Sequence, residues 1–337
     1  MAALGILNPT LLDIAKASDP DGKIATIVEI LSETNEILTD MTWQEGNLPT
    51  GHRSTIRTGI PTATWRKLYG GVPSAKATTA QVTDNTGMLE AYSVIDKALA
   101  DLNGNTAAYR LTQDRAFIEG MNQKVAEAIF YGNESTEPEA FTGLSPRFNS
   151  VVAATAASAE NVLDAAGTGT DNASIWLVVW SPLTCFGIIP RGSKAGLQMT
   201  DKGQVTVEDA SNGSNTGAME AYRTHYRWDA GLSVPDWRYV CRIANIDKSN
   251  LTKDAASGAN LPDLMFEAMN IIPNLSIGRP AFYMSRKVLT TLRQQTANLT
   301  KNSSLETTMV GGKMVTSFQG VPLRRCDALS ADEARVV

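Results

Sequence analysis

Residues 51–86 constrain the fold most, because they contain too few bulky apolar side chains to build a core of their own. The segment reads GHRSTIRTGIPTATWRKLYGGVPSAKATTAQVTDNT, with threonines, glycines and isolated apolar residues but no helical spacing. This pattern predicts an extended hairpin with arms of about 18 residues, which could project roughly 50–60 Å. Since a lone two-stranded hairpin is only marginally stable in water, we expect the segment to lie on another surface.

Charge indicates what kind of surface that is. Residues 51–86 carry five basic residues against one acidic residue, a net charge of +4, whereas residues 1–50 carry eight acidic and two basic residues, a net charge of −6. Such neighbouring segments suit head-to-tail contacts between copies of one chain, and a solvated run of charges is the alternative that charge alone leaves open. The expected contact residues are Arg53, Arg57, Trp65, Arg66, Lys67 and Lys76 in the hairpin, and Glu29, Glu33 and Glu36 in the acidic arm.

Composition narrows the class of protein. The chain has 337 residues, 43% of them apolar, which is enough for a sizeable core in one elaborated domain or two. A net charge of −5 argues against a general nucleic-acid binder. Three widely spaced cysteines without a CxxC pair predict buried thiols and neither a disulfide framework nor a zinc site. No basic leader or apolar run of 18 residues is present, so we expect neither a signal peptide nor a membrane anchor.

The remaining patterns indicate an α+β protein of two lobes. Helical spacing predicts a long helix over 107–131, which ends before Gly132, and an apolar stripe predicts another helix over 24–38. Residues 88–102 fit a strand or a helix equally well, while 151–172 read as a short helix with a linker and 191–216 as a loop. Further strands are expected at 174–182, 218–228, 237–246 and 281–284, further helices at 10–15, 261–269 and 285–295, and a hairpin at 311–323.

Catalytic patterns are missing from the sequence. His52 and His225 are the two histidines, and no G-x-S-x-G nucleophile elbow occurs. The run from Gly70 to Lys76 lacks the spacing of a phosphate-binding loop, and residues 167–170 (GTGT) lack the third glycine of a dinucleotide fingerprint. We therefore expect no enzyme, no cofactor and no metal site.

Four long strings carry a resemblance to a known family: NPTLLDIAKASDPDG from Asn8, EGNLPTGHRSTIRTGIPTATWRKLYGGV from Glu45, GMLEAYSVIDKALADLNGN from Gly87 and FTGLSPRFN from Phe141. The chain resembles the major capsid proteins of tailed bacteriophages, which have the Hong Kong 97-type fold, and specifically the GP7 family of such proteins. The likeness is strongest over the first 150 residues and moderate over 279–327.

The resemblance implies a division of the chain. Residues 1–50 would be the N-terminal arm, 51–86 the extended E-loop, and 160–270 the axial domain. The peripheral domain would combine 87–159 with 271–337 and contain the spine helix 107–131.

The resemblance also implies partners. Copies would assemble as hexamers and pentamers into an icosahedral shell of the virion, in the host bacterial cytoplasm, around double-stranded DNA held without sequence specificity. A separate scaffolding protein, a portal protein and a cement or decoration protein would be further partners.

Two other classes of protein stay open at this point. One is the shell protein of an encapsulin-like cellular nanocompartment, which has a similar fold. The other is an enzyme or glycan-binding module whose pocket is lined by tryptophans, namely Trp176, Trp180, Trp228 and Trp237, although tryptophans at strand positions are more often part of a core.

Overall fold

The computed structural model describes residues 33–102, 106–208, 218–253, 255, 258–298, 305–310 and 313–337. The helix expected at 10–15, most of the one expected at 24–38, and Glu29 lie outside these residues. The described chain forms two compact units. The first comprises Met88–Val125 and Lys194–Asp229 together with Glu33, and the second comprises Thr34–Gly87, Ala126–Ser193 and Ala230–Val337.

A seven-stranded sheet forms the core of the second unit, in the order β11-β12-β13-β10-β5-β9-β4. Strand β5 lies inside it and pairs antiparallel with both β10 and β9. Its continuous apolar sequence suits a strand covered on both faces, and all nine of its residues are buried. The strands are β4 (Val162–Asp164), β5 (Asn172–Trp180), β9 (Val240–Asp247), β10 (Arg279–Met284), β11 (Leu305–Val310), β12 (Lys313–Phe318) and β13 (Val321–Arg325).

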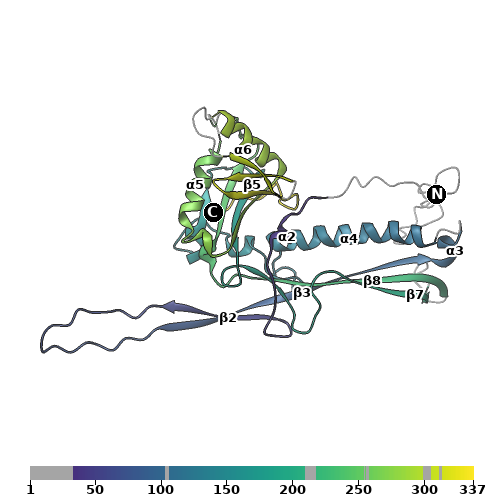
Figure 1. Ribbon diagram of the computed structural model, residues 1–337, viewed down its shortest axis with the longest axis horizontal. Coiled ribbons are helices and arrows are strands. Elements are labelled where there is room, and N and C mark those ends of the chain that lie inside the picture. Colours follow the sequence, from purple (N-terminus) through teal and green to yellow (C-terminus); the bar gives the residue numbers. More distant parts are fainter. Residues whose placement is uncertain are drawn as a thin grey trace. The chain divides into compact units, whose positions relative to one another are not determined.

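Two helices of the second unit pack on this sheet (Figure 1). Helix α5 (Leu261–Ile271) buries Leu261, Met265 and Ala268, whose spacing places them on one face. Helix α6 (Arg286–Asn298) buries Val288 and Leu292 in the same apolar cluster. The α+β class predicted from the sequence is confirmed. Short 3-10 turns complete the unit at Ser145–Arg147, Ala157–Asn161, Trp237–Tyr239 and Leu275–Ile277.

In the first unit, one long helix packs on a small sheet. Strand β8 (Ala218–Ser233) lies between β7 (Gln198–Glu208) and β3 (Thr78–Asp96), and helix α4 (Thr106–Tyr131) runs along it (Figure 1). The ring of Phe117 on α4 stacks on that of Tyr226 on β8, with centroids 5.8 Å apart. Strand β3 leads into the short helix α3 (Lys97–Ala100), where Leu99 packs on Tyr109 of α4. The helix predicted at 107–131 is confirmed.

Three sequence-based predictions were wrong. The loop expected at 191–216 contains β7, because its polar residues pair with β8 over nearly the whole strand, from Gln198 opposite Arg227 to Glu208 opposite Ala218. Residues 151–172, expected to be a short helix with a linker, contain a 3-10 helix at Ala157–Asn161, but β4 follows it in place of a linker and pairs with β9.

The third wrong prediction is the continuous helix over 24–38. Residues 33–36 are not helical, and α2 covers only Ile37–Asp40. Asn35 instead forms a bridge with Cys326, and its side-chain oxygen accepts a hydrogen bond from the Ala328 backbone. This tertiary pairing overrides local helix propensity.

Candidate assembly surface

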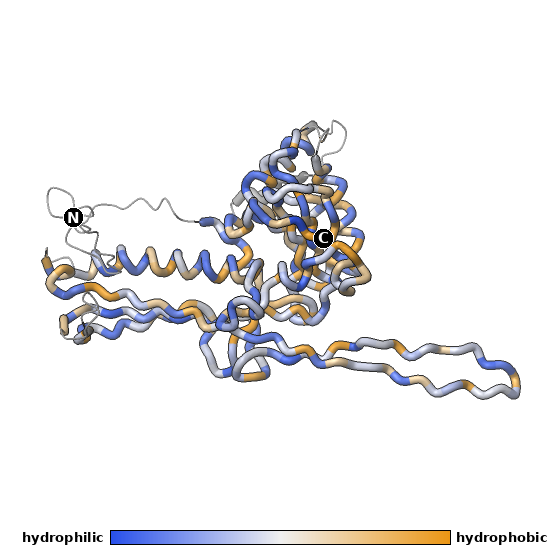
Figure 2. Tube along the Cα trace, turned by 180° about the vertical axis from the view of Figure 1, so that it is seen from behind, coloured by the Kyte–Doolittle hydropathy of each residue, from blue (hydrophilic) through white to orange (hydrophobic). Residues whose placement is uncertain are grey.

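Residues 51–86 form the predicted hairpin. Strand β2 (Gly51–Gly59) pairs antiparallel with the first part of β3, from Gly51 opposite Asn85 to Gly59 opposite Thr78. The paired arms are shorter than expected, and residues 60–77 continue as a long open loop (Figure 1). Figure 2 shows isolated apolar positions separated by polar ones along the hairpin. The segment therefore has no core of its own, as its sequence indicated.

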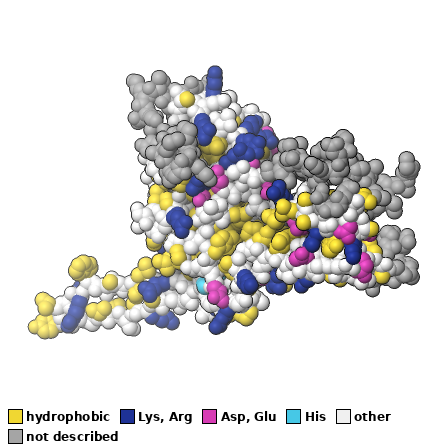
Figure 3. Space-filling model, turned by 45° about the vertical axis from the view of Figure 1, so that its right-hand side comes forward, with side chains coloured by type: hydrophobic (Ala, Val, Ile, Leu, Met, Phe, Trp, Pro, Cys, Tyr) yellow, Lys and Arg dark blue, Asp and Glu magenta, His cyan; other side chains and the backbone are white. Residues whose placement is uncertain are grey.

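The far end of the hairpin presents large apolar side chains to solvent. Trp65 and Tyr69 are 103% exposed relative to the reference state, and Ile60, Leu68 and Val72 are exposed as well. Figure 3 shows hydrophobic side chains beside basic ones at the end of the projecting hairpin. Five large apolar side chains exposed within 13 residues are unusual for a soluble monomer, so this tip indicates an interaction surface.

Local hydrogen bonds shape this tip. The Gly70 amide donates to the carbonyl oxygen of Lys67 at 3.0 Å, and Arg66 Nε donates to the carbonyl oxygen of Gly70 at 3.0 Å. Tyr69 has a φ of 65°, in the left-handed region that non-glycine residues seldom adopt. The turn thus holds the aromatic side chains of the tip outward at a cost in backbone strain.

The basic residues of the hairpin point to solvent. All five are exposed, and none pairs with a carboxylate among the residues that the structure describes. Arg53 Nε donates to Thr83 Oγ1 across the two strands at 3.2 Å. Their charges are therefore available to a partner.

The described acidic candidates, Glu33 and Glu36, differ from the basic residues of the hairpin because each has a contact within its own unit. Glu36 pairs with Arg324 at 3.2 Å, within its own unit. The backbone amide of Glu33 donates to Glu119 Oε1 of α4 at 2.8 Å. Within the described second unit, Glu36 makes no contact with the basic residues of the hairpin.

Sequence reasoning missed the residue that anchors the hairpin. Asp84, with 4% of its side chain exposed, lies 2.8 Å from the Arg147 guanidinium and accepts a hydrogen bond from Ser233 Oγ at 2.6 Å. Arg147 also donates to the carbonyl oxygens of Thr142 and Leu232. No local signal could reveal this pair, because its partners come from distant parts of the chain.

Further contacts fix the root of the hairpin. The Thr86 amide donates to the carbonyl oxygen of Thr50, and the Asn47 side chain bonds both backbone groups of Arg53, at 2.7 and 2.8 Å. His52 packs edge-on against the ring of Phe186, with centroids 5.4 Å apart. His52 therefore has a packing role at the start of β2.

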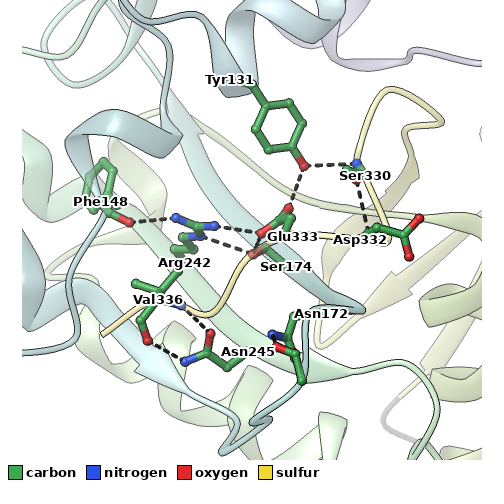
Figure 4. A network of polar contacts seen from close by, with 11 residues as sticks. Tyr131, Phe148, Asn172, Ser174, Arg242, Asn245, Ser330, Asp332, Glu333 and Val336 are labelled. Carbon is green, nitrogen blue, oxygen red and sulfur yellow. Dashed lines mark hydrogen bonds and ion pairs between the residues drawn. The ribbon is translucent and has the colours of Figure 1, made fainter.

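A buried polar network holds the C-terminal segment onto the central sheet (Figure 4). Arg242 on β9 pairs with Glu333 at 2.7 Å and donates to the carbonyl oxygen of Phe148 at 2.8 Å. Glu333 also accepts hydrogen bonds from Ser174 Oγ on β5 and from the Tyr131 hydroxyl. Burial, and then the Glu333 charge, raise the pKa of Tyr131 well above its usual range. The network thus ties α4, β5 and β9 to one carboxylate.

The groups with catalytic potential are used structurally. His225 stacks on Tyr92, with centroids 4.5 Å apart, and its Nε2 lies 3.2 Å from Glu90 Oε2. The three cysteines are buried, as predicted, and burial raises the pKa of the Cys241 thiol to about 12. Within the described ranges no group of His, Cys, Asp and Glu side chains could hold a metal ion. Trp176 and Trp180 belong to the buried core and line no open pocket.

Among the helices of the described residues, none is both long and apolar enough to cross a bilayer.

Comparison with known proteins identifies the family. The model of the family described as "Major capsid protein GP7" matches residues 19–337. A chain in a near-atomic structure of bacteriophage Epsilon15 is 37% identical, with 100% of each chain covered and a TM-score of 0.81. The capsid of bacteriophage JBD30 is 10% identical over 89% of this chain and 92% of that one, with a TM-score of 0.48, and adds nothing to the assignment. No curated protein sequence matches the chain.

The family model covers nearly the whole chain, and the chain from the bacteriophage Epsilon15 structure is similar to it over its full length in both sequence and fold. The resemblance seen in the four sequence strings is confirmed, and neither alternative class is favoured. The chain belongs to the major capsid protein GP7 family, and it is a major capsid protein of the tailed-bacteriophage type with the Hong Kong 97-type fold.

Proposed function

We propose that the hairpin 51–86 is the E-loop through which one copy of the chain holds the next in the phage head. The observation that supports this proposal most is the fully exposed pair Trp65 and Tyr69, flanked by Arg66 and Lys67. Aromatic and Arg side chains supply most of the binding energy at protein interfaces, and here they stand on a hairpin anchored at Asp84.

The remaining parts of the shell follow the division expected from the resemblance. Residues 1–50 serve as the N-terminal arm, 160–270 as the axial domain around the capsomer centre, and 87–159 with 271–337 as the peripheral domain. Helix α4 contains the spine helix of that domain. Hexamers and pentamers of the chain close into an icosahedral shell in the bacterial cytoplasm, around double-stranded DNA held without sequence specificity.

Assembly in this scheme involves other proteins. A separate scaffolding protein guides shell formation, a portal protein occupies one vertex, and a cement or decoration protein is a further partner. The large interfaces of such a shell, on the order of thousands of Å² per subunit, need no catalytic group. The protein therefore acts as a structural component and not as an enzyme.

Deleting Ser54–Thr83 tests the role of the hairpin. The root at Asp84 and Thr86 stays, so we expect a soluble subunit with unchanged circular dichroism beyond the lost strands, but no closed shells by negative-stain electron microscopy. A second variant replaces Trp65 and Tyr69 with Ser, which removes the apolar tip but keeps the hairpin length, and it should also fail to form closed shells. Shells of normal size from the deleted chain would contradict the proposal.

Charge reversal tests the electrostatic part separately. Arg53 and Arg57 lie on strand β2, and replacing both with Glu should weaken assembly more at low ionic strength than at high ionic strength. At physiological ionic strength the Debye length is about 8–10 Å, so added salt already screens much of the attraction between exposed charges. An equal loss of assembly at every salt concentration would show that these charges do not act electrostatically between subunits.

A further inference from the structure

Strand β3 has an open edge over its second half. Strand β2 pairs with β3 only as far as Asn85, and β8 lies on the other side of β3. Among the described residues no strand continues β2 along Met88–Asp96, so the backbone groups on that edge have no sheet partner. Such an edge is a template for a strand from another chain.

An apolar groove lies beside this edge, between β3 and helix α4. Its volume is about 360 Å³, and it is lined by Leu89, Glu90 and Ala91 of β3 and by Ala116, Phe117, Gly120, Met121 and Lys124 of α4. Leu89 and Ala91 are half-buried and alternate with exposed residues, because they share the face of β3 that turns toward the helix. A groove of this size, mostly apolar, can hold one large apolar side chain.

Gly120 leaves one wall of the groove open. It lies in the middle of α4, where glycine destabilises a helix relative to alanine, and a Cβ at this position would meet no atom within 4 Å. Packing inside the described part of the subunit therefore does not require glycine here. The space is available to a side chain that enters from outside.

One segment of the exposed hairpin suits both the edge and the groove. Residues 62–67 (TATWRK) follow Pro61 and are exposed throughout. Within the described residues the backbone hydrogen bond of this segment is the one that Lys67 accepts from the Gly70 amide. Threonines alternate with Ala63 and Trp65, a pattern typical of a strand with one apolar side.

The two faces of such a strand match the two faces of β3. Successive side chains of a strand point to opposite faces, so Trp65 and Arg66 separate, as do Ala91 and Glu90. With Trp65 opposite Ala91, the indole turns toward the groove and Arg66 comes to lie opposite Glu90 on the other face. The small side chain of Ala91 leaves room for the indole.

Glu90 has an oxygen free for this contact. Its Oε2 lies 3.2 Å from His225 Nε2, whereas its Oε1 is 3.7 Å from Arg227 Nε, which is too far for a hydrogen bond. The carboxylate is 38% exposed, so a second guanidinium can reach Oε1. Apolar fit and charge therefore indicate the same register.

From these features we infer that residues 62–67 of one copy add an antiparallel strand to the open edge of β3 in an adjacent copy, with Trp65 in the groove and Arg66 beside Glu90. The inference rests on the proposed role of the hairpin as a link between subunits, and it names the surface that receives the hairpin. A parallel strand with Arg66 at Glu90 would instead set Trp65 against the larger Leu89.

Single cysteines in two co-assembled chains test this register. Thr62→Cys in one chain and Val94→Cys in a second, mass-tagged chain lie directly opposite in the inferred pairing. Mild oxidation of the shells should give disulfide-linked heterodimers, detected by non-reducing gels and peptide mass spectrometry. Since each chain carries one added cysteine, the heterodimer reports contact between copies. The native cysteines are buried, so unmodified shells give the background.

The matched control replaces Val94→Cys with Met88→Cys. Met88 shares the face of Val94 and is 64% exposed, but it lies six residues away, about 20 Å along the strand. Because a disulfide needs Cα atoms within about 7 Å, this control should give roughly tenfold less heterodimer. Equal yields from the two pairs, or no heterodimer above background, would overturn the inferred pairing.

Filling the groove tests the same contact without cysteines. Gly120→Leu should leave a soluble subunit with unchanged circular dichroism but lower the yield of closed shells at least tenfold, because the added side chain occupies the space for Trp65. Ala108→Leu adds the same bulk at an exposed position of α4 outside the groove and should assemble like the unmodified chain.

The outcomes separate this inference from the proposed function. Normal shells from Gly120→Leu would reject the groove as the docking site. If the chain without Ser54–Thr83 then still fails to form shells, the hairpin joins subunits at another surface and its proposed role stands. Normal shells from both variants would reject the docking site and the role of the hairpin together.

Discussion

The anchor of the hairpin at Asp84 leads to a quantitative prediction. Asp84→Asn keeps the size of the side chain and an oxygen that can accept the Ser233 hydrogen bond, but it removes the negative charge 2.8 Å from Arg147. Removing one partner of a buried ion pair costs about 3–5 kcal/mol. Arg147 is 21% exposed and keeps its carbonyl partners, which offset part of this loss, so we expect a cost of about 2–3 kcal/mol.

The assay is urea unfolding of unassembled subunits, followed by the fluorescence of the buried tryptophans in the same unit, Trp176 and Trp180. With a slope of about 3 kcal/mol per M urea, the midpoint of this unit should fall by roughly 0.7–1 M. Asp332→Asn is the matched control, because it removes the same charge from a pair whose carboxylate is 75% exposed, and it should cost less than about 1 kcal/mol.

A double-mutant cycle isolates the pair. Arg147→Met combined with Asp84→Asn should cost clearly less than the sum of the two single changes. Each single variant leaves one buried charge without its partner, whereas the double variant leaves none. The reasoning fails if Asp84→Asn costs no more than Asp332→Asn, or if the two changes at the anchor are additive.

Three further predictions concern the body of the subunit. Glu333→Gln leaves Arg242 buried without its counter-charge and should cost about 3 kcal/mol in the same assay, whereas an effect below 1 kcal/mol would contradict a structural role for the network. Burial would raise the pKa of Asp327, but hydrogen bonds from arginine side chains outweigh it and hold the pKa well below its usual range, so its contribution to stability is present above about pH 4 and is lost as the pH falls further. The stability gap between the wild type and Asp327→Asn should accordingly stay constant near neutral pH and narrow below about pH 4, and a gap that widens on acidification would refute this. Gly120→Ala on α4 meets no atom within 4 Å and should stabilise by about 0.5–1 kcal/mol, while Gly143→Ala would place a Cβ 2.5 Å from a backbone oxygen and should destabilise, which thermal unfolding can compare.

Elements with a strong local signal could be predicted from the sequence. Helix α4 has helical spacing and ends before Gly132, and β5 has an unbroken apolar run. The hairpin at 51–86 could be predicted because its sequence has neither helical periodicity nor enough bulky apolar residues for a core. In each case the information lies within a few neighbouring residues.

Features that depend on distant partners escaped prediction. Strand β7 is polar and its strand character comes from pairing with β8, and Asn35 leaves the expected helix to pair with Cys326. For the candidate site, the exposed basic residues and Trp65 could be named from the sequence, whereas the exposed Tyr69 was missed. The ion pair between Asp84 and Arg147 that anchors the hairpin could not be predicted, because a count of charges along the sequence does not show which basic residue a carboxylate contacts.

A single-particle reconstruction of assembled shells at side-chain resolution would show whether the hairpin joins one subunit to the next. We expect Trp65 and Tyr69, exposed in the single chain, to be buried against an adjacent copy, with the basic residues of the hairpin near its carboxylates. A shell in which the tip of the hairpin stays in solvent, or folds back on its own subunit, would contradict the claim that this hairpin joins one subunit to the next.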